Sequence, residues 1–409
     1  MINVLEPHEI LEKWSNPDMG KLSIAGIEDP AVQFATGQIL ENVEKYYKGS
    51  SLGLLLEGPS SVAPVSQATG QFQPISLALA RRVTPDLFAW KCVPVQPMNG
   101  PVGLAYAMRF YYQGTTKEAN FDDMNYFSTF SGNLSGTSGA SDTGTGVSLA
   151  TAESWALGDT TNPTPQLVYA MSRVAIEANT RKIGANVSLE AMMDVKAMHN
   201  VDVKQNLVKK LKDQVLAEID RELLQNMKTQ STTTANGGEA LSVWQTSATD
   251  GRWQGEKFAT VGNAIIQKGN DVGTSTRVGT ANFCVVSQRV ATALQAIPTI
   301  FTAHQFKVGA IGTTALASIG TLNGQLAVYV DRYAVTDYAL VGLKGADQDE
   351  GGIIYSPYVM GLESEATDPN NFSAKVGVMN RYAITASLLG AGRYYRQILF
   401  ANLNTMTQF

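Results

Sequence analysis

The chain has 409 residues, 44% of them hydrophobic, and a net charge of −5 at pH 7. This length favours two or three globular domains, and the acidic balance argues against a specific nucleic-acid site, which usually needs a basic stripe. No run of 18 apolar residues and no N-terminal basic and apolar signal occur, so we expect a cytoplasmic product that neither spans a membrane nor is secreted. The two cysteines, Cys92 and Cys284, lie in apolar runs and are predicted to be small buried side chains in a reducing compartment.

The first 57 residues predict a helical arm. Pro7 opens one short helix, and Asp29 followed by Pro30 supplies a cap and a first-turn proline for a second. One face of the second helix is apolar and consists of Val32, Ala35, Ile39, Val43 and Tyr46. The arm is too small to bury this face by itself, so we expect the face to need a partner, which would be a neighbour or scaffold if the arm is kept as a clasp. The arm holds nine acidic residues and four lysines, which is the whole net charge of −5.

After a linker rich in Gly, Ser and Pro at residues 51–71, residues 102–179 predict an extended hairpin. Its strands are Val102–Tyr112 and Leu167–Asn179, which both alternate with a period of two. The centre of the connection, Ser131–Thr151, contains five Gly, five Ser and four Thr with one charge. Because an isolated two-stranded hairpin is marginal in water, we expect this one to lie against a neighbouring subunit.

Residues 202–229 predict one helix about 40 Å long. Asp202 is placed to cap it, and its charged residues, Glu218 and Glu222 among them, are predicted to form a solvated face. Apolar residues recur at every fourth position of this segment, at Val203, Leu207, Leu211, Val215, Ile219, Leu223 and Met227.

A mixed region of helices and strands follows at Leu241–Asn371, and we interpret it as an inserted domain. Two final strands, Ala374–Ser387 and Arg393–Leu403, are predicted to return beside the long helix.

No catalytic, cofactor or metal constellation emerges. His8, His199 and His304 are scattered, and Asp347–Gly352 starts like a calcium loop but lacks its later acidic ligands, so we interpret it as a solvated turn. We therefore predict no enzyme activity, no cofactor and no metal.

Several segments in order along the chain resemble the major capsid (head) protein of T-even-type, contractile-tailed bacteriophages. The resemblance extends from about Phe72 to Tyr382. The segments that carry it are Pro94–Arg109, Thr151–Asp159, Leu322–Gly324, Val328–Ala334, Val341–Gly345, Tyr355–Val359 and Asn371–Gly377.

The resemblance implies an α+β chain with the Hong Kong 97-type capsid fold. It would begin with an N-terminal arm and linker (1–71), the entry to the P-domain (72–101) and an E-loop (102–179). A P-domain with its spine helix at 202–229 (180–240), an A-domain (241–371) and return strands (372–409) would follow. Relatives carry a folded insertion in the E-loop, whereas Gln113–Gln166 is short and low in complexity, so we expect no such domain.

The function implied is a structural subunit that forms hexamers and pentamers of an icosahedral head enclosing double-stranded DNA, assembled in the host bacterial cytoplasm. Its partners would be other copies of itself, scaffold, portal, vertex and decoration proteins, and packaged DNA through non-specific contact with the inner surface. The alternatives are a vertex protein that makes only pentamers, a nanocompartment shell, and a soluble enzyme.

Two groups of residues are candidate sites. We predict intersubunit contacts at Arg81, Arg82, Arg109, Lys117 and Arg173. Lys117 is the only lysine of the hairpin connection, and we do not expect it to form a covalent crosslink.

The second site is a position for proteolytic processing. Relatives are often trimmed after a glutamate that follows Leu or Ile by two residues, and Leu55 and Glu57 before Gly58 meet this short pattern. Residues 1–57 are therefore either a removable assembly segment or a permanent clasp.

Overall fold

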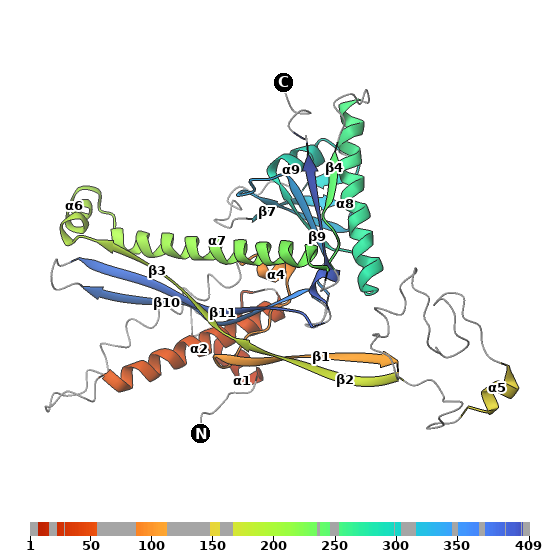
Figure 1. The fold of residues 1–409 in the computed structure, drawn as a ribbon. Coiled ribbons are helices and arrows are strands. Elements are labelled where there is room, and N and C mark those ends of the chain that lie inside the picture. Colours follow the sequence, from red (N-terminus) through yellow and green to blue (C-terminus); the bar gives the residue numbers. More distant parts are fainter. Residues whose placement is uncertain are drawn as a thin grey trace.

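The computed structural model describes residues 7–15, 23–27, 29–54, 87–112, 148–155, 167–234, 238–245, 253–297, 299–303, 316–345, 351–367, 373–388, 390–401 and 403 (Figure 1). Among these residues, the long helix, a narrow three-stranded sheet, an extended hairpin and a larger mixed sheet are the main parts. They form an α+β fold, as predicted.

Two helices form the N-terminal part, α1 (Pro7–Ser15) and α2 (Pro30–Leu54). Asp29 caps α2 as predicted, because its Oδ1 accepts a hydrogen bond from the backbone N–H of Ala31 at 2.9 Å. The apolar face of α2 is buried from Val32 to Val43, with Ile39 and Val43 fully covered. Helix α2 packs against α1 and against strand β10 (Ile353–Thr367) of the same chain (Figure 1). The rest of the same chain therefore supplies the partner that the described part of this face needs, rather than a neighbour or a scaffold.

The hairpin consists of β1 (Val102–Tyr112) and β2 (Leu167–Glu177). The two strands pair antiparallel over their full length, from Val102 opposite Glu177 to Tyr112 opposite Leu167. This confirms both predicted strands, except that β2 ends two residues early and β3 (Asn179–Val187) begins directly after it. Figure 1 shows the hairpin extending away from the rest of the chain.

The long helix α7 (Val203–Thr232) contains 30 residues and confirms the predicted spine. Asp202 caps it by accepting from the N–H of Lys204 at 3.0 Å. Its apolar stripe is buried from Val208 to Met227, with Ile219 fully covered. The stripe packs against the three-stranded sheet in the order β10-β11-β3, in which β10 spans Ile353–Thr367 and β11 spans Ala374–Ala386, both pairings being antiparallel.

A seven-stranded sheet with the order β4-β12-β9-β5-β8-β7-β6 forms the second main part. It is mixed, because β12–β4 and β5–β8 are parallel while its other pairs are antiparallel. Helices α8 (Gln254–Thr276) and α9 (Gln288–Gln295) pack on it. Its strands are β4 (Ser242–Gln245), β5 (Phe283–Ser287), β6 (Phe301–Ala303), β7 (Leu316–Leu322), β8 (Leu326–Asp331), β9 (Tyr338–Gly342) and β12 (Tyr395–Ala401).

The predicted boundary between residues 241–371 and 372–409 cuts across both sheets. Strand β10 lies in the three-stranded sheet beside α7, although it precedes the boundary. Strand β12 follows the boundary and yet lies in the seven-stranded sheet, where it also contacts α7. The two sheets therefore exchange strands, and the mixed region is not a simple insertion.

Short elements complete the described part. They are α4 (Ala89–Cys92), α5 (Leu149–Glu153), α6 (Leu189–His199) and the 3-10 helix η5 (Ala391–Tyr394).

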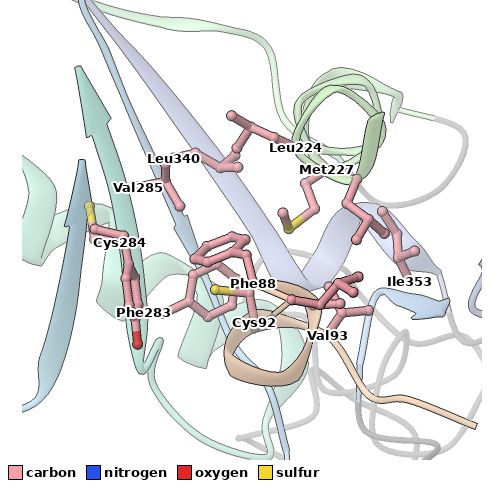
Figure 2. Packing of buried hydrophobic residues seen from close by; sticks show 14 of the residues in the cluster. Phe88, Cys92, Val93, Leu224, Met227, Phe283, Cys284, Val285, Leu340 and Ile353 are labelled. Carbon is pink, nitrogen blue, oxygen red and sulfur yellow. The ribbon is translucent and has the colours of Figure 1, made fainter. Parts of the chain in front are cut away.

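One hydrophobic cluster joins the arm, α7 and both sheets. Figure 2 shows its centre, where Phe88, Cys92 and Val93 lie between α7 and the seven-stranded sheet. Phe88 also packs edge-to-face on Tyr329, with ring centroids 5.1 Å apart. Segment 87–93 is thus a wedge that fixes the long helix relative to the larger sheet.

Candidate intersubunit contact sites

The outer face of the hairpin exposes several large apolar side chains together with the charged residues Arg173 and Glu177. Opposed residues of antiparallel strands share a face, so alternate residues of β1 and β2 form one continuous surface. The exposed large apolar side chains on this face are Val102, Leu104, Tyr106, Tyr169 and Met171. A contiguous apolar surface on a narrow ribbon is costly in water and typically marks an interaction site.

The root of the hairpin is fixed to its own chain. Ala105 and Ile176, on the other face, are buried in a small cluster with Met98, Ile354 and Ala383. The N–H of Ala178 donates to the carbonyl of Pro101 at 2.9 Å and closes the base. The chain therefore holds one end of the hairpin and leaves the apolar outer face exposed.

Two of the predicted intersubunit residues lie on this hairpin. Arg173 is exposed on the outer face, directly opposite Tyr106 in the register. Arg109 lies on β1 opposite Ala170, on the other face by register, and its side chain is outside the described residues. The structure thus places Arg173, but not Arg109, on the exposed apolar face.

The other predicted site residues lie outside the described part of the chain. These are Leu55, Glu57, Gly58, Arg81, Arg82 and Lys117. Helix α2 is described as far as Leu54, the residue directly before the predicted processing segment.

A polar cluster that the sequence analysis missed joins α7 to the three-stranded sheet. Arg181 of β3 donates to Glu218 at 2.9 Å and to Tyr382 Oη at 2.9 Å, and it also bonds Glu222. Tyr382 of β11 donates in turn to Glu222. The expectation that Glu218 and Glu222 face only solvent is therefore wrong, because both are half-buried against Arg181. Their spacing of four residues, which places them on one side of α7, was the available signal.

A groove of about 450 Å³ runs between α7 and the turn that follows β8. Its cations are engaged within the chain: Arg181 by the two glutamates, Arg221 over the ring of Tyr333, and Lys228 3.5 Å from the centroid of Tyr338. Tyr338 donates to Asp331 at 2.6 Å. The contacts of Arg221 and Lys228 hold the helix against the larger sheet, whereas those of Arg181 hold it against the three-stranded sheet.

The described residues offer no cluster of three or more His, Cys, Asp or Glu that could hold a metal ion. Cys92 and Cys284 are both fully buried, as predicted, and burial raises the pKa of both thiols, which disfavours reactive thiolates. Within the same residues, none of the helices is long and apolar enough to cross a membrane.

Comparison with known proteins gives consistent matches. The family model described as "Major capsid protein Gp23" matches residues 69–407. The major capsid protein of Vibrio phage KVP40 is 26% identical over 92% of this chain and 92% of its own length. That of Salmonella phage ViI is 28% identical over 95% of this chain and 92% of its own. Among solved structures, "The capsid of Myoviridae Phage XM1" aligns with a TM-score of 0.42 and 9% identity over 77% of this chain and 91% of that one.

A second kind of relative matches less of the chain. The capsid vertex protein of Vibrio phage KVP40 is 23% identical over 54% of this chain and 69% of its own length. The same phage thus holds two relatives of this chain, and the major capsid protein aligns with far more of it.

Proposed function

Because the chain belongs to the Gp23 family of phage major capsid proteins, we propose that it forms the hexamers and pentamers of an icosahedral head that encloses double-stranded DNA. Family membership makes it a structural component of the virion, and the family is not one of enzymes. The exposed apolar face of the β1–β2 hairpin is the observation that supports self-assembly, because it needs a cover that the described chain does not supply.

The parts of the fold suit this role. The hairpin is the E-loop within residues 102–179 and lies across a neighbouring subunit, where Arg173 sits among apolar side chains and would pair with an acidic group. Helix α7 with the three-stranded sheet is the P-domain, and the seven-stranded sheet is the A-domain. Strand β12 follows the predicted A-domain but joins its sheet, whereas β10 precedes the boundary and lies in the P-domain sheet.

The shell role is favoured over a dedicated vertex role by coverage. Major capsid relatives align with 92% and 95% of this chain, whereas the vertex relative aligns with 54%. A nanocompartment shell would use the same contacts, and only the presence of packaged DNA would separate the two.

The proposed partners follow from assembly. Other copies of the chain form the capsomers, with scaffold, portal, vertex and decoration proteins completing the head. Residues 58–409 contain 27 acidic and 27 basic residues, so a subunit without the arm would have no net charge and would meet DNA by non-specific contact.

Particle mass tests the proposal. Full-length chain, expressed with its assembly partners, should form particles, tubes or sheets of megadalton mass in light scattering. Tyr106→Glu should prevent this, because a charge on the covered apolar face would be buried without a partner. Val278→Glu is the matched control, since Val278 is 49% exposed and Tyr106 is 50% exposed, but Val278 lies outside the hairpin. A small oligomer as the only product of the native chain would contradict the proposal.

A further inference from the structure

Helix α6 is unusual because none of its residues is buried, although its sequence is apolar around most of its circumference. Ser188 caps its start by accepting from the N–H of Ala191 at 3.3 Å, and Asn200, with φ of 52°, ends it in the left-handed region. A helix of 11 residues is marginal in water by itself, and a helix that is apolar all round is normally covered. The two caps alone do not account for the stability of this uncovered helix.

One side of α6 carries an ordered row of exposed apolar residues. Leu189, Met193 and Ala197 recur every fourth residue and form one exposed row, with Leu189 41% and Met193 64% exposed. From the helical period, Glu190 and Asp194 lie along one flank of this row and Lys196 lies along the other. Within the described residues, these three charged side chains have no ion-pair partner.

The position of α6 favours contact with other copies. It precedes the N-terminus of α7, at the end of the long helix that is remote from the seven-stranded sheet (Figure 1). It therefore lies at one extremity of the subunit, where contact with another subunit would not require the fold to change.

We infer that α6 packs against the α6 helices of other copies, arranged in parallel around a rotation axis that runs along the helices. This inference rests on the proposed assembly into a shell. In such an arrangement the rows of Leu189 and Met193 face each other. Rotation brings Lys196 of one copy against the acidic flank, Glu190 and Asp194, of the next.

The charged flanks of the row distinguish this parallel arrangement from an antiparallel one. Two antiparallel α6 helices related by a two-fold axis across them would place acidic flank beside acidic flank. Like charges at such close range repel, whereas the parallel arrangement pairs opposite charges. The asymmetric flanks of the row thus favour an axis along the helix.

The contact is too small to act alone. A stable interface usually buries about 800 Å² on each partner, more than one short helix can supply. The α6 contact would add to a shell in which other contacts already hold the subunits close together. The effective concentration of neighbouring α6 helices is then high. Separate subunits should therefore not associate through α6.

Disulfide trapping in assembled particles tests the arrangement. Cys92 and Cys284 are fully buried, so single variants Leu189→Cys, Met193→Cys and Met198→Cys each report on the introduced thiol. Parallel helices bring each residue of the row near its own counterpart, within reach of a disulfide. Leu189→Cys and Met193→Cys should give about tenfold more linked dimer than Met198→Cys, which lies away from the row on the same helix.

Each outcome decides the inference. If particles form and Leu189→Cys links no better than Met198→Cys, the parallel arrangement is wrong. Linkage of Met193→Cys without Leu189→Cys indicates antiparallel helices and also overturns it. A linked product containing another protein shows that a different partner covers α6. Failure of the native chain to form particles would instead count against the proposed function.

Charge exchange gives an independent readout. Lys196→Glu should lower particle yield, and adding Glu190→Lys and Asp194→Lys should restore it, because the pairing is then reversed. Lack of restoration, with the triple variant folded, would contradict the pairing of the flanks.

Discussion

Oδ1 of Asp220, in the middle of α7, accepts a hydrogen bond from the backbone N–H of Phe88 at 3.2 Å. Asp220 is 1% exposed, and its Oδ2 has no hydrogen-bond partner among the described residues. A carboxylate thus lies within the apolar contact between the long helix and the wedge formed by segment 87–93. The carboxylate accepts the hydrogen bond of the Phe88 N–H, directly before α4, but its own negative charge is costly to bury.

This placement predicts that stability depends on pH. Burial raises the pKa of Asp220 from 3.8 to about 7, although the Phe88 hydrogen bond and the charge of Lys91 oppose the shift. Because the folded-state pKa lies above the unfolded one, protonation of Asp220 stabilises the folded subunit. This stabilisation is fully present below about pH 4 and is lost as pH rises through about 7. Asp220→Asn should stabilise the subunit by about 1–3 kcal/mol at pH 8 and have little effect at pH 4.

Chemical unfolding of separate subunits at several pH values measures this effect. Glu256→Gln is the control, because Glu256 is an exposed acid on α8 and should leave the pH dependence unchanged. Equal slopes of unfolding free energy against pH for the native chain and Asp220→Asn would show that Asp220 does not titrate in this range.

The second prediction concerns the apolar stripe of α7. Ile219 is fully buried in the main cluster, so Ile219→Asp would place an unpaired charge there. We expect a loss of about 4 kcal/mol or more, which removes most of the stability of a typical domain and abolishes soluble yield and assembly. Gln225→Asp, on an exposed position of the same helix, should retain both. Normal particles from Ile219→Asp would show that the stripe is not buried.

The third prediction concerns Arg181. Arg181→Met should leave Glu218 and Glu222 beside each other without their cation and loosen α7 from the three-stranded sheet. These side chains are about one-third exposed, so solvent reduces the cost to about 1–2 kcal/mol. The neighbouring Lys182→Met, on an exposed position of β3, serves as the control in urea unfolding. Equal midpoints for the two variants would mean that the cluster contributes little.

The sequence was informative where periodicity was strong. The stripe of α7 and the alternation of β1 required only local spacing, and both were predicted within three residues of their ends. The caps at Asp29 and Asp202 were also recognisable, because capping depends on residues two or three positions apart.

Long-range pairing was not accessible in the same way. Arg181 reaches Tyr382, which is 201 residues away, and nothing in the local spacing of either residue indicates the other. For the same reason, the sequence indicated a strand at Arg393–Leu403, where β12 lies, but could not show that this strand joins the seven-stranded sheet on the far side of the predicted boundary. The burial of Asp220 was missed because a carboxylate on a long helix is usually solvated.

The fourth prediction concerns the connection between β1 and β2. Deleting Gly132–Thr145, which lies outside the described residues, should leave the subunit folded, because the hairpin root is held by Ala105 and Ile176. Assembly should weaken or change, since the tip would no longer reach its neighbour. Thermal melting of subunits and electron microscopy of particles measure the two effects. Altered melting together with unchanged shells would contradict the prediction.

The last prediction concerns the arm before Gly58, which is either trimmed after Glu57 or kept. The arm is built into the fold: Asn42 Nδ2 donates to the carbonyls of Met98 at 2.7 Å and Tyr358 at 3.0 Å. Lys13 pairs with Glu41 at 2.7 Å, and Trp14 lies in the main cluster. A chain that begins at Gly58 should therefore be less stable and less soluble as a separate subunit than the full chain, because apolar surface under α1 and α2 is uncovered.

This burial makes the timing of any cleavage testable. If trimming occurs, it should follow assembly, when neighbouring subunits hold the remaining chain and compensate for the lost contacts. Intact-mass measurement should then find the full-length 43.9 kDa in early shells and a chain starting at Gly58 in DNA-filled heads. The full-length mass in DNA-filled heads would rule out trimming and leave the arm as a permanent part of the fold. A shortened chain already present in unassembled subunits would contradict the role of the arm in stabilising the separate subunit.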